Sequence, residues 1–169
     1  MKFLSANLDN LRKLYIDELQ HLHSAETQIT EALPKMIEAA TDPQLKNALQ
    51  THLSETETHV TRLDEILNAS EGEVDSKKCK VMASLLSAGE DLLKDTTDDA
   101  VRDAAIIAAA QRVEHYEIAS YGTVRTFAEI LGEEQHADLL ETTLEEEKHA
   151  DAILTEISDT ANTRADKAA

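Results

Sequence analysis

Apolar residues recur every three or four positions over long stretches of the chain, which is the spacing of an amphipathic α-helix. A first helix is predicted from about Leu8 to Ala40, with a kink at Pro34, because proline removes a backbone donor and crowds the preceding turn. Asp42 as N-cap and Pro43 at the first helical position begin a second helix. The two apolar stripes contain Leu11, Tyr15, Leu19, Leu22, Ile29, Leu33 and Ile37, and then Leu45, Leu49, Leu63, Ile66 and Leu67.

The second half of the chain repeats the helical pattern after a polar loop at residues 69–78. Residues 79–93 form a short amphipathic segment, and Thr97-Asp98-Asp99 is an acidic helix start. The long apolar face that follows ends at Gly132, which is a typical C-cap. A further long helix is expected from about Glu134 to Asp159, followed by a disordered tail at residues 162–169.

Two helical hairpins joined by a long connection that carries its own short helix form a known topology of the four-helix bundle. The long crossover makes the second and third long helices parallel, as in ferritin-like folds. The sequence therefore predicts an all-α, ferritin-like four-helix bundle of two antiparallel helical hairpins, with a short fifth helix in the crossover. We expect residues 1–161 to form a single domain, since a chain of 169 residues can bury one core.

The charge balance narrows the range of partners. The chain has 34 acidic and 16 basic residues and a net charge of −18, so it repels nucleic acids and anionic membranes. A single cysteine, Cys79, excludes a disulfide framework within the chain and fits a reducing compartment. No run approaches the roughly 18 apolar residues of a membrane span, and the first residues lack a signal-peptide core. We therefore expect a cytoplasmic protein.

Each of the four long predicted helices carries an acidic residue on or near its apolar stripe, close to the middle of the helix. A carboxylate removed from water without a partner costs several kcal/mol, so a shared compensating charge is indicated. Two iron or manganese ions are the best candidate, because both metals accept carboxylate oxygen and imidazole nitrogen ligands. The predicted ligands are Glu26, Glu55, Glu114, Glu117, Glu147 and Asp151, with His52 and His59 as the possible nitrogen donors.

The ligand pattern departs from that of known di-metal bundles, which place Glu on two helices and Glu-x-x-His on the other two. Neither Glu55 nor Glu147 is followed by a histidine three residues later. The one literal match, Glu146 to His149, directs His149 nearly opposite to Glu147 on the helix. A nitrogen ligand would therefore come from one of the two histidines of the second helix.

Several segments of the chain carry a recognisable combination of residues. They are Ala25-Glu26, His52-Leu53-Ser54-Glu55-Thr56, Cys79, Asp103 to Gln111, Glu114-His115-Tyr116-Glu117-Ile118-Ala119-Ser120-Tyr121-Gly122-Thr123 and Leu144-Glu145-Glu146-Glu147-Lys148. Over roughly residues 8–158 the chain resembles the YciF/YciE family of bacterial ferritin-like proteins. The resemblance implies a ferritin-like bundle, di-metal binding, dimers and an association with bacterial stress responses.

A structural interpretation competes with the metal interpretation for each residue. The buried acids can form a salt-bridged core layer with Arg62 and Arg125, the basic residues on inward faces. In a metal-free core, Glu114 and Glu117 repel each other, so one of them would be protonated or turned outward. For Asp151 and for the two histidines of the second helix, a ligand role and a structural role both stay open.

The residues together with the family resemblance favour a cytoplasmic di-metal carboxylate protein that acts in the stress response; if the protein is catalytic, its metals would react with O₂ or peroxide. The alternative is a structural or interaction protein with the same fold and no turnover, because the Glu-x-x-His pair is missing. Iron storage in a cage is disfavoured, since nothing in the sequence indicates a shell. Apolar positions expected at the surface, such as Phe127 and Ile130, leave room for a homodimer face.

Overall fold

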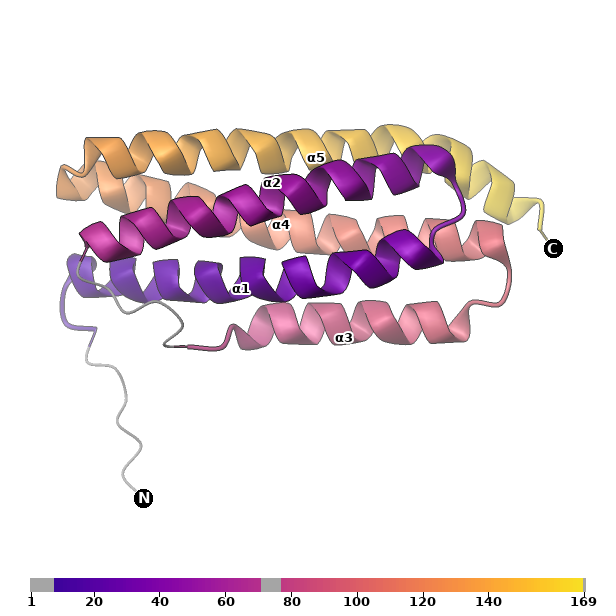
Figure 1. Cartoon of the computed structure of the whole chain (residues 1–169), viewed down its shortest axis with the longest axis horizontal. Coiled ribbons are helices and arrows are strands. Elements are labelled where there is room, and N and C mark those ends of the chain that lie inside the picture. Colours follow the sequence, from indigo (N-terminus) through magenta and orange to yellow (C-terminus); the bar gives the residue numbers. More distant parts are fainter. Residues whose placement is uncertain (1–7, 71–76, 169) are drawn as a thin grey trace, which may run out of the picture.

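The computed structural model describes residues 8–70 and 77–168, and these residues fold into five α-helices (Figure 1). None of the described helices has the length and apolar composition that a membrane crossing requires. The predicted loop at residues 69–78 falls largely on residues 71–76, which lie outside the described part. The helices are α1 (Leu11–Ala39), α2 (Pro43–Ala69), α3 (Lys80–Asp95), α4 (Asp99–Leu131) and α5 (Glu134–Asp166).

Four long helices form the bundle, and α3 lies along its outside (Figure 1). The hairpins are α1–α2 and α4–α5, and α1 also packs against α4 and α2 against α5. The helices α2 and α4 run in the same direction, and α3 packs on α1 and α4 within the crossover that joins the hairpins. The predicted ferritin-like bundle with a short fifth helix is therefore confirmed.

The predicted helix starts and stops are present in the structure. Asp42 accepts hydrogen bonds from the backbone N–H groups of Gln44 and Leu45, and Pro43 occupies the first turn of α2. Asp98 caps α4 in the same way. Gly132 has φ of 77°, a left-handed conformation that a residue with a Cβ adopts only with strain, and it ends α4.

The last helix is longer than the sequence pattern predicts. We expected it to end near Asp159 with a disordered tail from residue 162, but α5 continues to Asp166. The physical reason is tertiary, since Ala161 is fully buried and the guanidinium of Arg164 pairs with Asp42 at the start of α2. The assignment of residues 1–161 to one domain stays a prediction.

Two apolar clusters fill the bundle on either side of a polar layer. One cluster lies toward the α1–α2 turn and includes Ile29, Leu45 and Ile106. The other lies toward the α4–α5 turn and includes Leu19, Ile66 and Leu140. The polar residues between them are held at mid-length of the bundle by apolar packing at both ends.

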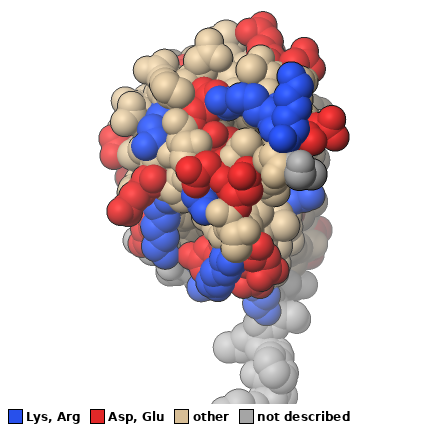
Figure 2. All heavy atoms as spheres, turned by 90° about the vertical axis from the view of Figure 1, so that its right-hand side faces the viewer, with Lys and Arg blue, Asp and Glu red and all other residues tan. Residues whose placement is uncertain are grey.

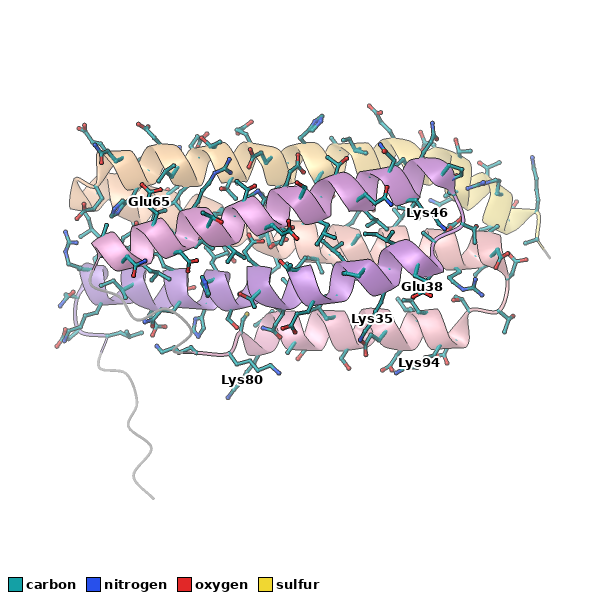
Figure 3. The ribbon with its side chains drawn as sticks, viewed as in Figure 1. Lys35, Glu38, Lys46, Glu65, Lys80 and Lys94 are labelled. Atoms are coloured by element: carbon teal, nitrogen blue, oxygen red, sulfur yellow. The ribbon has the colours of Figure 1, made fainter. Side chains whose placement is uncertain are left out.

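Charged side chains cover the outside of the bundle. Figure 2 views the end where α1 turns into α2 and shows acidic and basic side chains interspersed on that face. The labelled side chains of Figure 3 lie on the outward sides of α1, α2 and α3; they are Lys35, Glu38, Lys46, Glu65, Lys80 and Lys94. This solvated surface carries most of the acidic residues, so the buried acids described next are exceptions.

Asp103 fixes the α1–α2 turn from the neighbouring helix α4. Its carboxylate accepts hydrogen bonds from the N–H of Thr41 at 2.7 Å, the hydroxyl of Thr41 at 2.7 Å and the N–H of Asp42 at 2.9 Å. The Asp103 side chain and Asp42 are buried, whereas Thr41 is exposed, so the N–H of Asp42 is the donor that loses its partner without access to water when Asp103 is removed. This contact joins the two hairpins at one end of the bundle.

We expect Asp103→Ala to lower the free energy of unfolding by about 2 to 4 kcal/mol, because it removes three hydrogen bonds and leaves the buried N–H of Asp42 unsatisfied. Urea unfolding followed by circular dichroism measures the change. Asp99→Ala is the matched control, since Asp99 is exposed on the same helix and pairs with Arg102 at the surface, and it is expected to cost less than about 1 kcal/mol. Equal losses in the two variants would show that the Asp103 contact does not stabilise the turn.

Candidate metal centre

Six titratable side chains from four helices meet in the polar layer. All six are at most 6% exposed, and all six are among the predicted ligands. They are Glu26 from α1, His52 and His59 from α2, Glu114 and Glu117 from α4, and Glu147 from α5. The predicted convergence of acidic residues from separate helices on one level is therefore present in the structure.

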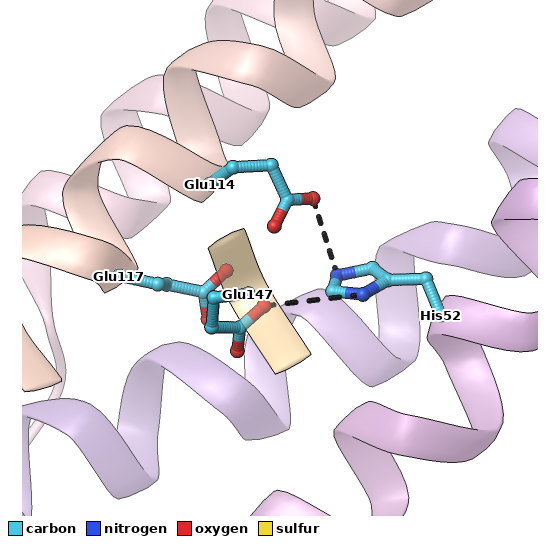
Figure 4. Close-up of side chains that lie close together, drawn as sticks. All are labelled: His52, Glu114, Glu117 and Glu147. Carbon is cyan, nitrogen blue, oxygen red and sulfur yellow. Dashed lines mark ion pairs between the residues drawn. The ribbon is translucent and has the colours of Figure 1, made fainter. Parts of the chain in front are cut away.

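One group within the layer consists of His52, Glu114, Glu117 and Glu147 (Figure 4). Each residue contributes one ligand-type atom, and these atoms lie within 4.8 Å of one another. The Nε2 atom of His52 is 3.4 Å from Oε1 of Glu114, and its Nδ1 atom is 4.0 Å from Oε2 of Glu147. The group offers three carboxylates and one imidazole to a common point.

A second group consists of Glu26, His59 and Glu147. The Nδ1 atom of His59 is 3.0 Å from Oε1 of Glu147 and 3.5 Å from Oε1 of Glu26. The hydroxyl of Tyr121 donates a hydrogen bond of 2.5 Å to Oε1 of Glu26. Glu147 belongs to both groups, so its carboxylate lies between them.

The second group is covered on its outer side by Arg62, which the sequence pattern predicts as an inward basic residue, and by Glu146 and Thr143, which the pattern does not connect with the layer. Oε2 of Glu146 is 2.9 Å from Nε2 of His59, and the guanidinium of Arg62 pairs with the same carboxylate and donates to the hydroxyl of Thr143 at 3.0 Å. His149 is exposed, so the Glu146 and His149 pair is not a ligand pair within the layer. The position of Arg62 one turn after His59 on the same helix is the sequence feature that could have indicated this contact.

Two predicted ligands lie outside the buried groups. The side chain of Glu55 is 32% exposed, and its Oε2 atom is 3.9 Å from Nδ1 of His52 at the edge of the layer. The side chain of Asp151 is 23% exposed and faces Nε2 of His115 at 3.3 Å. Asp151 also accepts a hydrogen bond from Gln111 at 3.4 Å. The ligand role of both residues stays a prediction, and neither is part of the described clusters.

A third cluster of possible ligands lies elsewhere on α1 and consists of Asp17, Glu18 and His21. Lys77 forms an ion pair with Asp17, so this cluster already has a cation partner. On the same helix, His23 is buried and its Nε2 atom is 2.9 Å from Asp64. These residues are separate from the polar layer.

Burial raises the pKa of three carboxyl groups in the layer. It raises the pKa of Glu26 and holds the pKa values of Glu114 and Glu117 well above their usual range. The negative charge of Glu147 raises all three further. Without a cation, the layer therefore retains protons at pH values where surface carboxyl groups are ionised.

His59 responds in the opposite direction to its surroundings. Burial by itself lowers its pKa, but the close contacts of its Nδ1 atom with Glu147 and Glu26 and the charges of these two groups raise the pKa to about 11. His59 is therefore protonated near neutral pH in the metal-free protein. A protonated imidazole compensates part of the negative charge of the second group.

Many ligand-type atoms of the layer have no hydrogen-bond partner. A satisfied core of this kind would pair these atoms, since an unpaired buried polar atom costs about 1 to 3 kcal/mol. Carboxylate oxygens and imidazole nitrogens in this combination fit a divalent transition metal, especially iron or manganese. The unpaired atoms are Oε2 of Glu26 and Glu114, both carboxylate oxygens of Glu117 and Glu147, both ring nitrogens of His52 and Nδ1 of His59.

Comparison with known proteins places the chain among bacterial relatives. Residues 10–166 match a family described as a domain of unknown function, DUF892. The YciF protein of Escherichia coli K12 is 40% identical over 165 residues, or 96% of this chain and 99% of that protein. The crystal structure of this E. coli stress protein matches with a TM-score of 0.88, over 92% of this chain and 98% of that chain. YcfI from Rhodopseudomonas palustris, described as a candidate structural protein, is 39% identical with a TM-score of 0.86, over 90% and 98% of the two chains.

We expect the metal-free protein to lose stability as the pH rises above the ordinary carboxyl pKa of 4.5 and toward the His59 pKa of about 11. Carboxyl groups with raised pKa values stabilise the fold fully below their unfolded value and lose this contribution as the pH rises through the folded value. His59 acts in the same direction, because its stabilising charge is lost as the pH approaches about 11. Urea unfolding with chelator present, repeated across this pH range, measures how the free energy of unfolding changes with pH.

Glu117→Gln tests whether the buried carboxyl groups cause this pH dependence of the unfolding free energy. The variant removes one buried acid and keeps its shape, so the metal-free variant is expected to be more stable than the parent at pH 8 by roughly 1 to 3 kcal/mol. The control is Glu145→Gln on the exposed face of α5, which is expected to change stability by less than about 0.5 kcal/mol. A metal-free Glu117→Gln variant that is less stable than the parent at pH 8 would contradict this assignment.

Proposed function

We propose that the chain, which belongs to the DUF892 family, binds two iron or manganese ions in the layer of buried Glu and His residues. We also propose that it acts in the bacterial stress response. The identity with YciF confirms the resemblance that the sequence motifs indicated. YciF of E. coli is described as a stress protein, which supports the same physiological setting for this chain.

The observation that carries the proposal is the set of unpaired ligand-type atoms at the centre of the bundle. Four carboxyl groups from three helices are at most 2% exposed and lie at one level. A buried ionised carboxylate without a counter-charge is strongly destabilising, so folded proteins compensate or neutralise it. Two divalent cations supply four positive charges at the point where the four carboxyl groups meet.

The two groups of the layer suggest how two ions would be held. His52, Glu114 and Glu117 would hold one ion, and Glu26 and His59 would hold the other. Glu147 belongs to both groups and has two oxygens without hydrogen-bond partners, so it would contribute to holding either ion. When bound, a pair of iron or manganese ions supplies redox chemistry toward O₂ or peroxide.

A salt-bridged core is the main structural competitor, and the positions of the arginines weigh against it. Arg62 pairs with Glu146 outside the layer. Arg125 pairs with Glu129 and Glu141 near the surface. Among the described residues, no lysine or arginine forms an ion pair with the four buried glutamates of the layer. The basic residues predicted as possible partners therefore compensate other charges.

One observation favours a second function, in which the bundle is a structural or interaction protein without turnover. His59 contacts Glu26, Glu146 and Glu147, and its raised pKa makes it a cation in the metal-free protein. The negative charge around His59, in the second group of the layer, is thus partly compensated without metal. The description of YcfI as a candidate structural protein agrees with this alternative.

Protein purified without chelator is expected to contain about two iron or manganese ions per chain, as measured by elemental analysis. The double variant Glu26→Gln, Glu147→Gln removes an acidic ligand from both groups and is expected to lose most of this metal. The matched control is Glu134→Gln, Glu145→Gln, which changes two exposed acids of α5 and keeps the metal content. A double variant that binds metal as well as the parent would overturn the proposed site.

Thermal unfolding separates the catalytic from the structural function. Saturating metal is expected to raise the Tm of the chelator-treated protein by roughly 5 to 10 °C, because a ligand at 100 times its Kd adds about 2.7 kcal/mol. Fe²⁺ oxidation and peroxide consumption are then assayed on the loaded protein. A raised Tm with turnover supports a redox function, whereas a raised Tm without turnover supports the structural alternative.

A further inference from the structure

A groove of about 690 Å³ runs between α2 and α5 and ends at the polar layer. Its walls come from the first half of α2 and from residues 149–157 of α5. His52 and Glu114 line its inner end, and both are buried. Both ring nitrogens of His52 lack a hydrogen-bond partner, so the groove leads to an unpartnered imidazole.

Within the described residues, the side of the layer at His59 is covered by side chains of α2 and α5. There Glu146 and Arg62 cover His59, and the hydroxyl of Tyr121 donates a hydrogen bond to Oε1 of Glu26. The guanidinium of Arg62 carries positive charge at this cover and opposes the approach of a cation. The layer is therefore asymmetric, with a positively charged cover at His59 and a groove at His52.

The groove carries groups that attract cations along its length. Glu156 and His149 are exposed and line its outer part. Glu55 is half-buried further in, with Oε2 at 3.9 Å from Nδ1 of His52. The residues that line the groove in the described structure include no lysine or arginine.

The donor atoms form a continuous series from solvent to the layer. Glu55 is in reach of His52, and Nε2 of His52 is 3.4 Å from Oε1 of Glu114. From the same imidazole, Nδ1 is 4.0 Å from Oε2 of Glu147. A cation can thus pass from a half-exposed carboxylate to an imidazole and then to buried carboxylates without leaving ligand-type atoms.

We propose that the groove between α2 and α5 is the entry route for divalent cations, with Glu55 as a transfer residue and His52 as the first group of the site that an incoming ion meets. This inference rests on the proposed metal-binding function. It assigns Glu55 to the delivery of the ion, not to the final ligand set. Net negative charge on the chain and acids along the groove concentrate cations at the entrance.

The test measures how fast the metal-free protein takes up Mn²⁺ from a fluorescent metal indicator after rapid mixing, and how much Mn²⁺ it holds at equilibrium. Ala48→Trp and Thr51→Trp each place a large side chain on the groove wall. Both are expected to slow uptake by roughly tenfold with the final Mn²⁺ content unchanged. Thr51 is exposed, so this variant is expected to fold even if Ala48→Trp does not. Ala119→Trp, at an exposed position of α4 outside the groove, is the control and keeps the parent rate.

Glu55→Gln tests the transfer role with a change of charge alone. It is expected to slow uptake several-fold and to keep the equilibrium Mn²⁺ content, whereas the control Glu145→Gln changes neither. Higher salt is expected to slow the parent more than the Glu55→Gln variant, because salt screens the attraction of the carboxylate. A lower Mn²⁺ content in Glu55→Gln at an unchanged rate would make Glu55 a ligand and overturn its transfer role.

Two further outcomes separate this inference from the function on which it rests. If both tryptophan variants fill with Mn²⁺ at the parent rate, the groove is not the entry route, although the metal site stands. If the parent takes up no Mn²⁺, the proposed function fails and the entry route fails with it.

Discussion

The burial of four carboxyl groups at the centre of a helical bundle is the constraint on which the rest of this structure depends. Glu26, Glu114, Glu117 and Glu147 are almost completely removed from water and lie close enough to repel one another. In such an interior each ionised carboxylate loses its hydration, so the layer must bind protons or cations. Apolar clusters on both sides supply the packing that holds this layer in place.

The two histidines give the two halves of the layer different properties. His59 is fully buried among three carboxylates and has a pKa of about 11, so it behaves as an internal cation in the metal-free protein. His52 lies at the end of the α2–α5 groove, and its ring nitrogens have no hydrogen-bond partners. A metal ion that reaches the layer therefore competes with a proton at His59. At His52 it meets an imidazole whose ring nitrogens have no hydrogen-bond partner.

Contacts between distant segments decide details that local patterns miss. Glu146 belongs to an acidic run that looks like a solvated helix face, yet it pairs with Arg62 and contacts His59. Tyr121 lies on an inward stripe, where packing alone is the simplest expectation, but its hydroxyl donates to Glu26. Both residues act on the layer through partners on another helix, which helical periodicity does not identify.

By itself the sequence determined the helices, their order and the position of the buried acids near mid-helix. The spacing of apolar residues, the capping residues and the length of the crossover can all be read directly from the chain. It also placed Glu26, Glu114, Glu117 and Glu147 inward, since a helix position fixes the direction of a side chain within a few tens of degrees. Only the tertiary structure decided that Glu146 pairs with Arg62 and that α5 continues to Asp166. These outcomes depend on how closely α2 and α5 approach and on the pairing of Arg164 with Asp42, which are contacts between helices far apart in the chain.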